Sequence, residues 1–123
     1  MIFIKHILAL IVIFELFTTN LYASNAKLLF NGNCTICHKI NSEKTAPSIL
    51  EIKQIYKRAF PLEKDFITQM SIWVNNPKAE TSIMLQSSDK FKIMPNLAYD
   101  ISLLEVISKY IYYTDFLEKN ENP

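Results

Sequence analysis

The sequence predicts an all-α domain of three to five short helices. Three observations predict it. Apolar residues recur at helical spacing, and capping residues and prolines stand at the ends of these segments. After the N-terminal segment, no stretch of useful length alternates between apolar and polar residues as a β-strand would. The chain has 123 residues, a net charge of +1 and one glycine, which together exclude disordered, collagen-like and nucleic-acid-binding classes. Its two cysteines are too few for a disulfide scaffold.

The N-terminus has the plan of a secretory signal peptide. A basic start is followed by an apolar run over 7–14 and by small residues at Ala23, Ser24 and Ala26. We expect a signal peptide over 1–23, with cleavage as late as Ala26. Because Glu15 interrupts the apolar segment, an uncleaved anchor and a buried N-terminal helix remain alternatives.

The domain is expected over 24–117, and its first two helices have recognisable ends. A short helix over 26–30 is expected to stop at Asn31, with Gly32 at the C′ position. A second helix is expected to begin at Ser48, with Glu51 completing a capping box, and to end before Pro61. Helical spacing predicts that its buried face consists of Ile49, Ile52, Ile55, Tyr56 and Ala59.

Two further helices are expected, with a loop over 78–92 between them. The third helix runs over 62–75, and Leu62, Phe66, Met70 and Trp73 share one face. The last helix opens near Asp100 or Ser102, the latter with Glu105 as a capping box. Its expected stripe consists of Leu103, Ile107, Tyr110, Thr114 and Leu117, with Leu104 and Ile111 beside it. The tail over 118–123 is expected to fray.

Cys34, Cys37 and His38 form the pattern C-x-x-C-H, which is the attachment signature of c-type haem. Two thiols three residues apart on a helical turn reach two vinyl groups of one porphyrin. The following imidazole then reaches the iron as an axial ligand. After removal of the signal, His38 is the one histidine that remains in the chain.

Three other interpretations of this motif stay open. A thiol–disulfide redox site also uses C-x-x-C, but it is expected between a strand and a helix. A structural zinc site requires four nitrogen or sulfur ligands, and the mature chain offers three. A disulfide between Cys34 and Cys37 is possible at this spacing but would be strained.

With these residues in place, the chain resembles a small class I cytochrome c over nearly all of its mature length. The stretch 26–30 matches the family's opening helix apart from Ala26, and 73–78 resembles a helix that ends in Asn-Pro-Lys. The resemblance implies short helices wrapped around one covalent haem, with the N- and C-terminal helices packed together. It also implies that the carbonyl of Pro47 accepts a hydrogen bond from the proximal imidazole, and that Trp73 lines the haem pocket.

The resemblance further implies a methionine as the second axial ligand of the iron. Met94 is followed by Pro95 and leads into the last helix, as in the family, so we expect Met94 to be this ligand. Met84 is the fallback, and Met70 is expected to pack in the core because it lies on a helix stripe.

The expected function is single-electron transfer with the iron cycling between Fe(III) and Fe(II), without any enzymatic reaction. The alternative is a haem-based sensor or gas-binding module with an open sixth coordination site. A peroxidase is less well supported, because the mature chain has no second histidine.

The expected location is the periplasm, and a membrane is involved only if the N-terminal segment stays uncleaved. The expected partners of this monomer are redox proteins, with no role for nucleic acid. Segment 27–92 carries ten Lys or Arg against six Asp or Glu, whereas 93–123 carries two against five. Four lysines flank the ligand segments and are expected to steer an acidic partner: Lys39, Lys44, Lys90 and Lys92.

Overall fold

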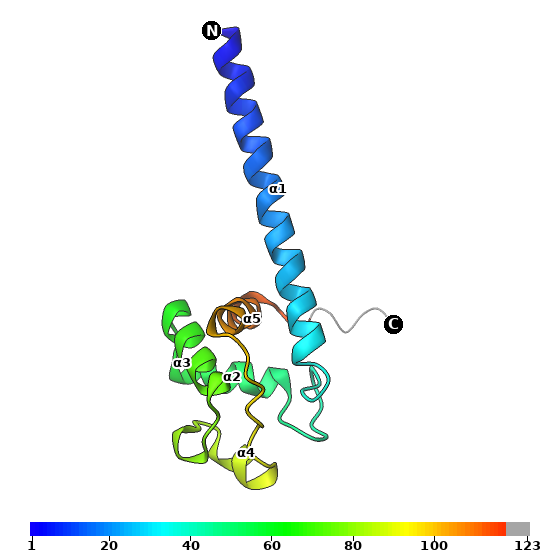
Figure 1. Cartoon of the computed structure of the whole chain (residues 1–123), viewed down its shortest axis with the longest axis vertical. Helices are drawn as coiled ribbons and strands as arrows, with labels where there is room; N and C mark the ends of the chain where they lie inside the picture. Colours follow the sequence, from blue (N-terminus) through cyan, green and yellow to red (C-terminus); the bar gives the residue numbers. More distant parts are fainter. Residues whose placement is uncertain (118–123) are drawn as a thin grey trace.

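The computed structural model describes residues 1–117, and over 16–24 it describes the backbone alone. The elements are α1 (Ile2–Asn33), α2 (Ile49–Ala59), α3 (Glu63–Asn75), the 3-10 turn η1 (Ala79–Thr81), α4 (Leu85–Lys90) and α5 (Ile101–Tyr113). Figure 1 shows α2 to α5 gathered around the C-terminal end of α1. No strand occurs over 1–117, which confirms the predicted all-α class. The predicted frayed tail, 118–123, lies outside the described residues.

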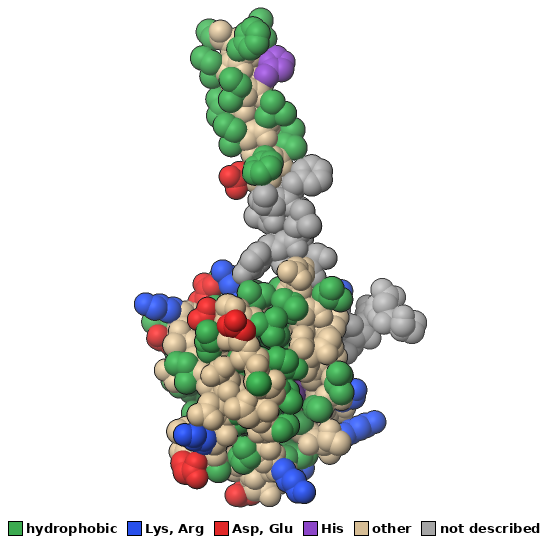
Figure 2. All heavy atoms as spheres, viewed as in Figure 1, with side chains coloured by type: hydrophobic (Ala, Val, Ile, Leu, Met, Phe, Trp, Pro, Cys, Tyr) green, Lys and Arg blue, Asp and Glu red, His purple; other side chains and the backbone are tan. Residues whose placement is uncertain are grey.

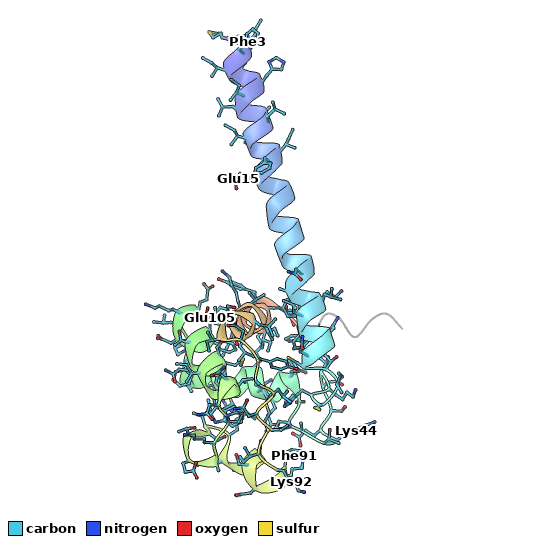
Figure 3. The ribbon with its side chains drawn as sticks, in the orientation of Figure 1. Phe3, Glu15, Lys44, Phe91, Lys92 and Glu105 are labelled. Carbon is cyan, nitrogen blue, oxygen red and sulfur yellow. The ribbon has the colours of Figure 1, made fainter. Side chains whose placement is uncertain are left out.

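α1 is one continuous helix whose N-terminal part projects away from the domain (Figure 1). Apolar side chains cover this projecting part on the face seen in Figure 2, and Phe3 and Glu15 both lie on it in Figure 3. Ile2 to Phe14 make no buried contact with the domain. Within the described part of the chain, no helix is both long and apolar enough to cross a membrane.

The end of α1 differs from the sequence-based expectation. The helix continues through Gly32 to Asn33, and no glycine of the described residues has a positive φ, so the predicted C′ role of Gly32 is wrong. The last turn stays helical because its carbonyl groups find donors. Asn33 Nδ2 donates to Leu29 O at 2.7 Å, and the Cys34 amide donates to Phe30 O at 2.9 Å.

α2 begins where its capping residue predicts. Ser48 is the N-cap, and its Oγ accepts a hydrogen bond from the Glu51 amide at 3.2 Å. Ile49 and Tyr56 are buried as expected, whereas Ala59 is exposed at the last turn. The Glu51 carboxylate contacts Ser87 rather than the Ser48 amide, so one half of the predicted capping box forms.

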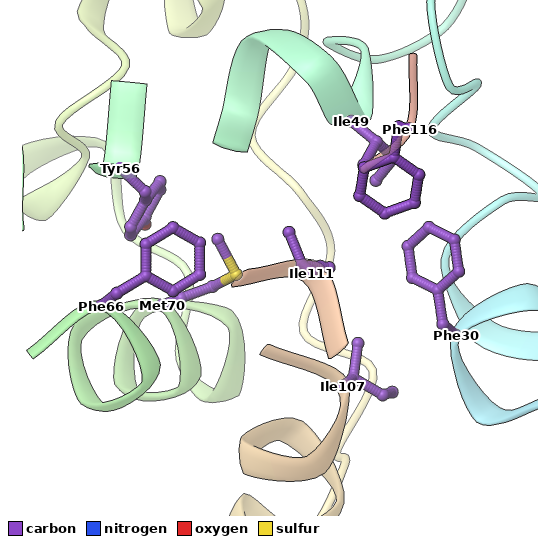
Figure 4. Packing of buried hydrophobic residues seen from close by; sticks show 8 residues of the cluster. All are labelled: Phe30, Ile49, Tyr56, Phe66, Met70, Ile107, Ile111 and Phe116. Carbon is purple, nitrogen blue, oxygen red and sulfur yellow. The ribbon is translucent and has the colours of Figure 1, made fainter. Parts of the chain in front are cut away.

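α5 crosses α3 and the C-terminal end of α1, and these two contacts make most of the core. Ser71 of α3 and Ser108 of α5 are both buried, and their hydroxyl groups form a hydrogen bond of 3.1 Å where the helices meet. This bond gives each buried hydroxyl a partner. Figure 4 shows eight apolar side chains of this core. They are Phe30, Ile49, Tyr56, Phe66, Met70, Ile107, Ile111 and Phe116.

Two predicted helix faces are corrected at their ends. Leu62 is the N-cap of α3 and is 67% exposed, and Leu117 lies beyond α5 and is 65% exposed. The buried positions of α5 are Leu104, Ile107, Ser108 and Ile111. Asp100 rather than Ser102 caps α5, because its carboxylate accepts from the Ser102 amide at 3.1 Å.

The segment predicted as loop over 78–92 contains η1 and α4. α4 has only six residues and is too short to be stable alone. Its contacts with distant parts of the chain therefore account for its presence. Ser87 in its middle is buried and bonds to Glu51 of α2.

Candidate functional site

The C-x-x-C-H motif forms a single turn that directly follows α1. Cys34 is the C-cap of the helix, and its carbonyl accepts hydrogen bonds from the Cys37 amide at 3.3 Å and from the His38 amide at 2.9 Å. Thr35 Oγ1 donates to Asn31 O at 2.8 Å and fastens the turn to the helix. One short piece of backbone therefore carries both thiols and the imidazole.

The two thiols are free and differ in their surroundings. Cys34 is half-buried against the apolar core, and Cys37 is exposed. Burial raises the pKa of the Cys34 thiol to about 11, so this thiol is protonated at neutral pH. A redox dithiol normally has a thiolate stabilised at a helix N-terminus. Because Cys34 ends a helix instead, the site lacks that stabilisation and the redox-dithiol interpretation loses support.

The imidazole of His38 is held by the residue that the resemblance singled out. His38 Nδ1 lies 2.8 Å from Pro47 O, and the carbonyl can only accept, so Nδ1 donates. This bond fixes the tautomer and leaves Nε2 with a free electron pair. Ile49 and Leu50 donate from their amides to Lys39 O and Ile40 O, at 2.9 and 3.0 Å, and these bonds hold the loop around His38 against the start of α2.

The donor set of this turn fits a covalently attached haem better than a bare metal ion. No three His, Cys, Asp or Glu side chains within the described residues converge to hold a metal ion, so the zinc interpretation has no ligand set here. A haem iron needs fewer ligands from the protein, because the porphyrin already supplies four nitrogens. Two free thiols and one imidazole with Nε2 available are the groups that such attachment uses.

The methionines separate into packed and half-exposed side chains. Met70 is buried in the core, as expected, and Met84 packs against that core from the N-cap position of α4. Met94 is half-exposed and is not part of this cluster. Met84 therefore has a packing role in this cluster, and Met94 lies outside it.

Met94 lies in an extended segment between α4 and α5, and side-chain amides hold its second half. Asn75 Nδ2 donates to Tyr99 O at 2.9 Å, which ties the segment to the end of α3. Asn96 Oδ1 accepts from the Ala98 amide at 2.8 Å, and Ala98 has a φ of 54°. The chain that follows Met94 is therefore placed by specific contacts.

Trp73 uses its indole N–H in a local hydrogen bond. Trp73 Nε1 donates to Lys78 O at 3.1 Å and closes the turn that follows α3. The ring lines a pocket of about 290 Å³ between α2, α3 and η1. That pocket contains none of Cys34, Cys37 and His38, and neither does a second, open groove of about 730 Å³ beside α2 and α5. Trp73 and the motif therefore do not share either of these two pockets.

The four lysines expected to steer a partner have different surroundings. Lys90 forms an ion pair with Glu43, and Lys39 Nζ donates to Thr35 O at 3.1 Å. Lys44 and Lys92 point outward from the domain in Figure 3. A further basic group on α2, Lys53, Lys57 and Arg58, lines the open groove beside α5 and was not predicted.

The link between Glu51 and Ser87 is a feature of the site that sequence reasoning missed. The sequence indicated only a capping role for Glu51 at the start of α2. Ser87 lies 36 residues further on, in a segment without a helix signal. No local pattern predicts such a contact.

Comparison of the chain with known protein families, with curated proteins and with solved structures finds no match in any of the three. The assignment of a function therefore depends on the residues of the site and on their geometry.

Proposed function

We propose that this chain is a single-electron carrier of the c-type cytochrome kind. In this proposal Cys34 and Cys37 hold one haem covalently, and His38 and Met94 ligate its iron. The sulfur of each cysteine would bond to one carbon of a vinyl group and the thiol hydrogen would go to the other, so attachment would need no oxidant. The haem supplies a metal that accepts and releases one electron.

The observation that carries the proposal is the hydrogen bond from His38 Nδ1 to Pro47 O. A histidine at the surface has no need of a fixed tautomer. The tautomer of His38 is fixed by a backbone carbonyl nine residues away, and His38 belongs to the turn that also carries both free thiols. Such bonding is typical of a metal-ligating histidine, since it orients the ring and makes Nε2 a better donor.

The surroundings of the methionines support Met94 as the second axial ligand. Met84 is engaged in the core and Met94 is not. The neutral, soft thioether raises the reduction potential relative to a second imidazole. The alternative with an open sixth site, a haem-based sensor, is distinguished by carbon monoxide, which binds rapidly to an open iron and slowly to one with His and Met ligands.

The proposal includes export to the periplasm, because bacterial c-type haem attachment takes place outside the cytoplasm. The apolar part of α1 supports it, since it projects from the domain without making buried contacts. Partner proteins then dock briefly through a small interface, with an acidic surface against the basic side chains near the motif.

A pyridine haemochrome spectrum together with the intact mass of periplasmic material tests the proposal. The full chain is co-expressed with a c-type cytochrome maturation system. We expect the spectrum of a haem with two thioether bonds and a mass increased by one haem. The Cys34→Ala, Cys37→Ala double variant should be colourless and carry no added mass. Wild-type material of bare polypeptide mass would refute the proposal.

A further inference from the structure

Glu51 connects the two segments that carry the proposed iron ligands. Its backbone amide donates to Ser48 Oγ at 3.2 Å, and Ser48 follows Pro47, which accepts the hydrogen bond of His38. Its side-chain Oε1 accepts from Ser87 Oγ at 3.3 Å. Ser87 belongs to α4 and leads into the chain that reaches Met94. One residue therefore contacts both the His38 side and the Met94 side of the site.

The attachment of α4 depends on few contacts. At its N-terminal end Met84 packs in the core, and at its C-terminal end Lys90 pairs with the exposed Glu43. An exposed ion pair of this kind contributes little to stability. Between them, buried Ser87 and half-buried Glu51 form a contact that is partly shielded from water. A partly shielded hydrogen bond to a carboxylate is stronger than a fully exposed ion pair.

The environment of Glu51 is costly for a carboxylate. Its Oε2 is buried and has no hydrogen-bond partner within the described residues. Burial and the neighbouring carboxylate of Glu43 raise the pKa of Glu51, while Ser87 and Lys90 lower it. A leucine would fill this position without that cost. The carboxylate is therefore better explained by the bond it makes than by packing.

We propose that Glu51 is a positioning residue for the iron ligands: through Ser87 it holds α4, and with it the segment of Met94, against α2 and the His38–Pro47 loop. This inference rests on the proposed function, because it concerns the ligands of the haem. It assigns Glu51 no contact with the haem itself. Loss of the bond frees the Met94 segment while the contacts of α1, α3 and α5 stay in place.

Competition by added imidazole measures how firmly Met94 is held. Imidazole replaces the thioether on the iron, and its apparent affinity rises when the Met94 segment is released. For the exported, haem-bearing full chain, we expect Glu51→Leu and Ser87→Ala each to raise that affinity about tenfold. Glu51→Gln keeps an amide oxygen for Ser87 and should stay within about twofold of wild type. Glu80→Leu, at an exposed position of η1, is the matched control and should change nothing.

Hydrogen–deuterium exchange on the same proteins gives a readout that is independent of ligand binding. The Phe91 amide donates to Ser87 O at 2.8 Å, and the Ser88 amide donates to Met84 O at 3.0 Å. Both amides should exchange about tenfold faster in Glu51→Leu and Ser87→Ala, with α3 and α5 unchanged. A general loss of stability would instead raise exchange in all helices. Ser87→Ala removes the same bond from the other side, so a poorly folding Glu51→Leu leaves the test intact.

The outcomes separate the two proposals. If the wild-type chain carries haem but both variants bind imidazole and exchange like wild type, the role of Glu51 is refuted and the proposed function stands. If wild-type material carries no covalent haem, the proposed function is refuted, and so is the role of Glu51 in positioning iron ligands. Raised affinity together with faster exchange confined to α4 supports both.

Discussion

His38 Nδ1 donates a hydrogen bond of 2.8 Å to the carbonyl oxygen of Pro47, nine residues along the chain. The acceptor belongs to the backbone, so the bond depends on how rigidly the loop holds that carbonyl. Proline fixes its own φ, and Ser48 directly after it begins α2. The geometry of the imidazole is thus determined by a proline and a helix N-cap.

Pro47→Gly is expected to raise the reduction potential of the haem-bearing protein. A looser carbonyl accepts a weaker hydrogen bond, so the imidazole donates less electron density and the Fe(III) state is less stabilised. We expect a rise on the order of tens of millivolts, where about 59 mV corresponds to a tenfold change for one electron. A redox titration measures it. Pro61→Gly is the control, because the Pro61 carbonyl accepts from Tyr112 at 3.0 Å instead, and an equal shift there would contradict the argument.

Met94→Ala is expected to abolish the sulfur-to-iron charge-transfer absorption and to allow rapid binding of carbon monoxide. Met84→Ala and Met70→Ala should keep the absorption and lose stability instead. Met70 is 4% exposed, so its loss should cost roughly 2–5 kcal/mol of unfolding free energy, and that of half-buried Met84 less. Survival of the absorption in Met94→Ala would show that another residue is the ligand. Rapid carbon monoxide binding to wild type would favour the sensor alternative.

Charge reversal at Lys44 or Lys92 is expected to slow association with an acidic redox partner. Both side chains point outward in Figure 3, whereas Lys90 is already paired with Glu43. At low ionic strength we expect a rate about two- to fivefold lower for Lys44→Glu or Lys92→Glu, converging with wild type as salt rises. Stopped-flow kinetics measure it. Lys64→Glu, on the exposed side of α3, carries the same charge change, and an equal effect there would mean that net charge alone matters.

Elements with local signals were predicted well. Ser48 as N-cap placed the start of α2 within one residue, and Leu62 to Asn75 gave α3 within one residue at its start. Hydrogen bonds between neighbours in sequence determine these boundaries, so a single sequence contains them. For the site, the motif and the resemblance together led to the contact between His38 and Pro47.

The features that sequence reasoning missed depend on side-chain contacts, some of them between distant parts of the chain. α4 is held by Glu51 and Glu43, which lie 36 and 47 residues from their partners Ser87 and Lys90. Gly32 was expected to end a helix, but side-chain donors beyond it keep the turn helical. The indole N–H of Trp73 donates to Lys78 O, a partner that no spacing indicates, and the place of Trp73 in a haem pocket stays a prediction.

Signal removal is expected to leave Ser24 as the first residue. Ala26 is only 6% exposed, in the part of α1 that packs against α5. Cleavage after Ala26 would remove this buried side chain, whereas cleavage after Ala23 keeps it. Intact-mass measurement of the exported protein distinguishes the two. A mature chain that begins at Lys27 would contradict the expectation, and a chain that keeps residues 1–23 would favour the anchor.

Ala98→Gly is expected to stabilise the protein by about 0.5–1 kcal/mol. Ala98 has a φ of 54°, a conformation that an alanine adopts with strain and a glycine without it. The Asn96 side chain holds this turn by accepting from the Ala98 amide, so the conformation is determined by its surroundings. Urea unfolding should show a higher midpoint with an unchanged slope. Ala59→Gly in the last turn of α2 makes the same chemical change in a helical conformation and should destabilise by up to about 1 kcal/mol. Because Ala98 lies four residues after Met94, the charge-transfer absorption should persist in Ala98→Gly, and its loss would show that this turn also places the ligand.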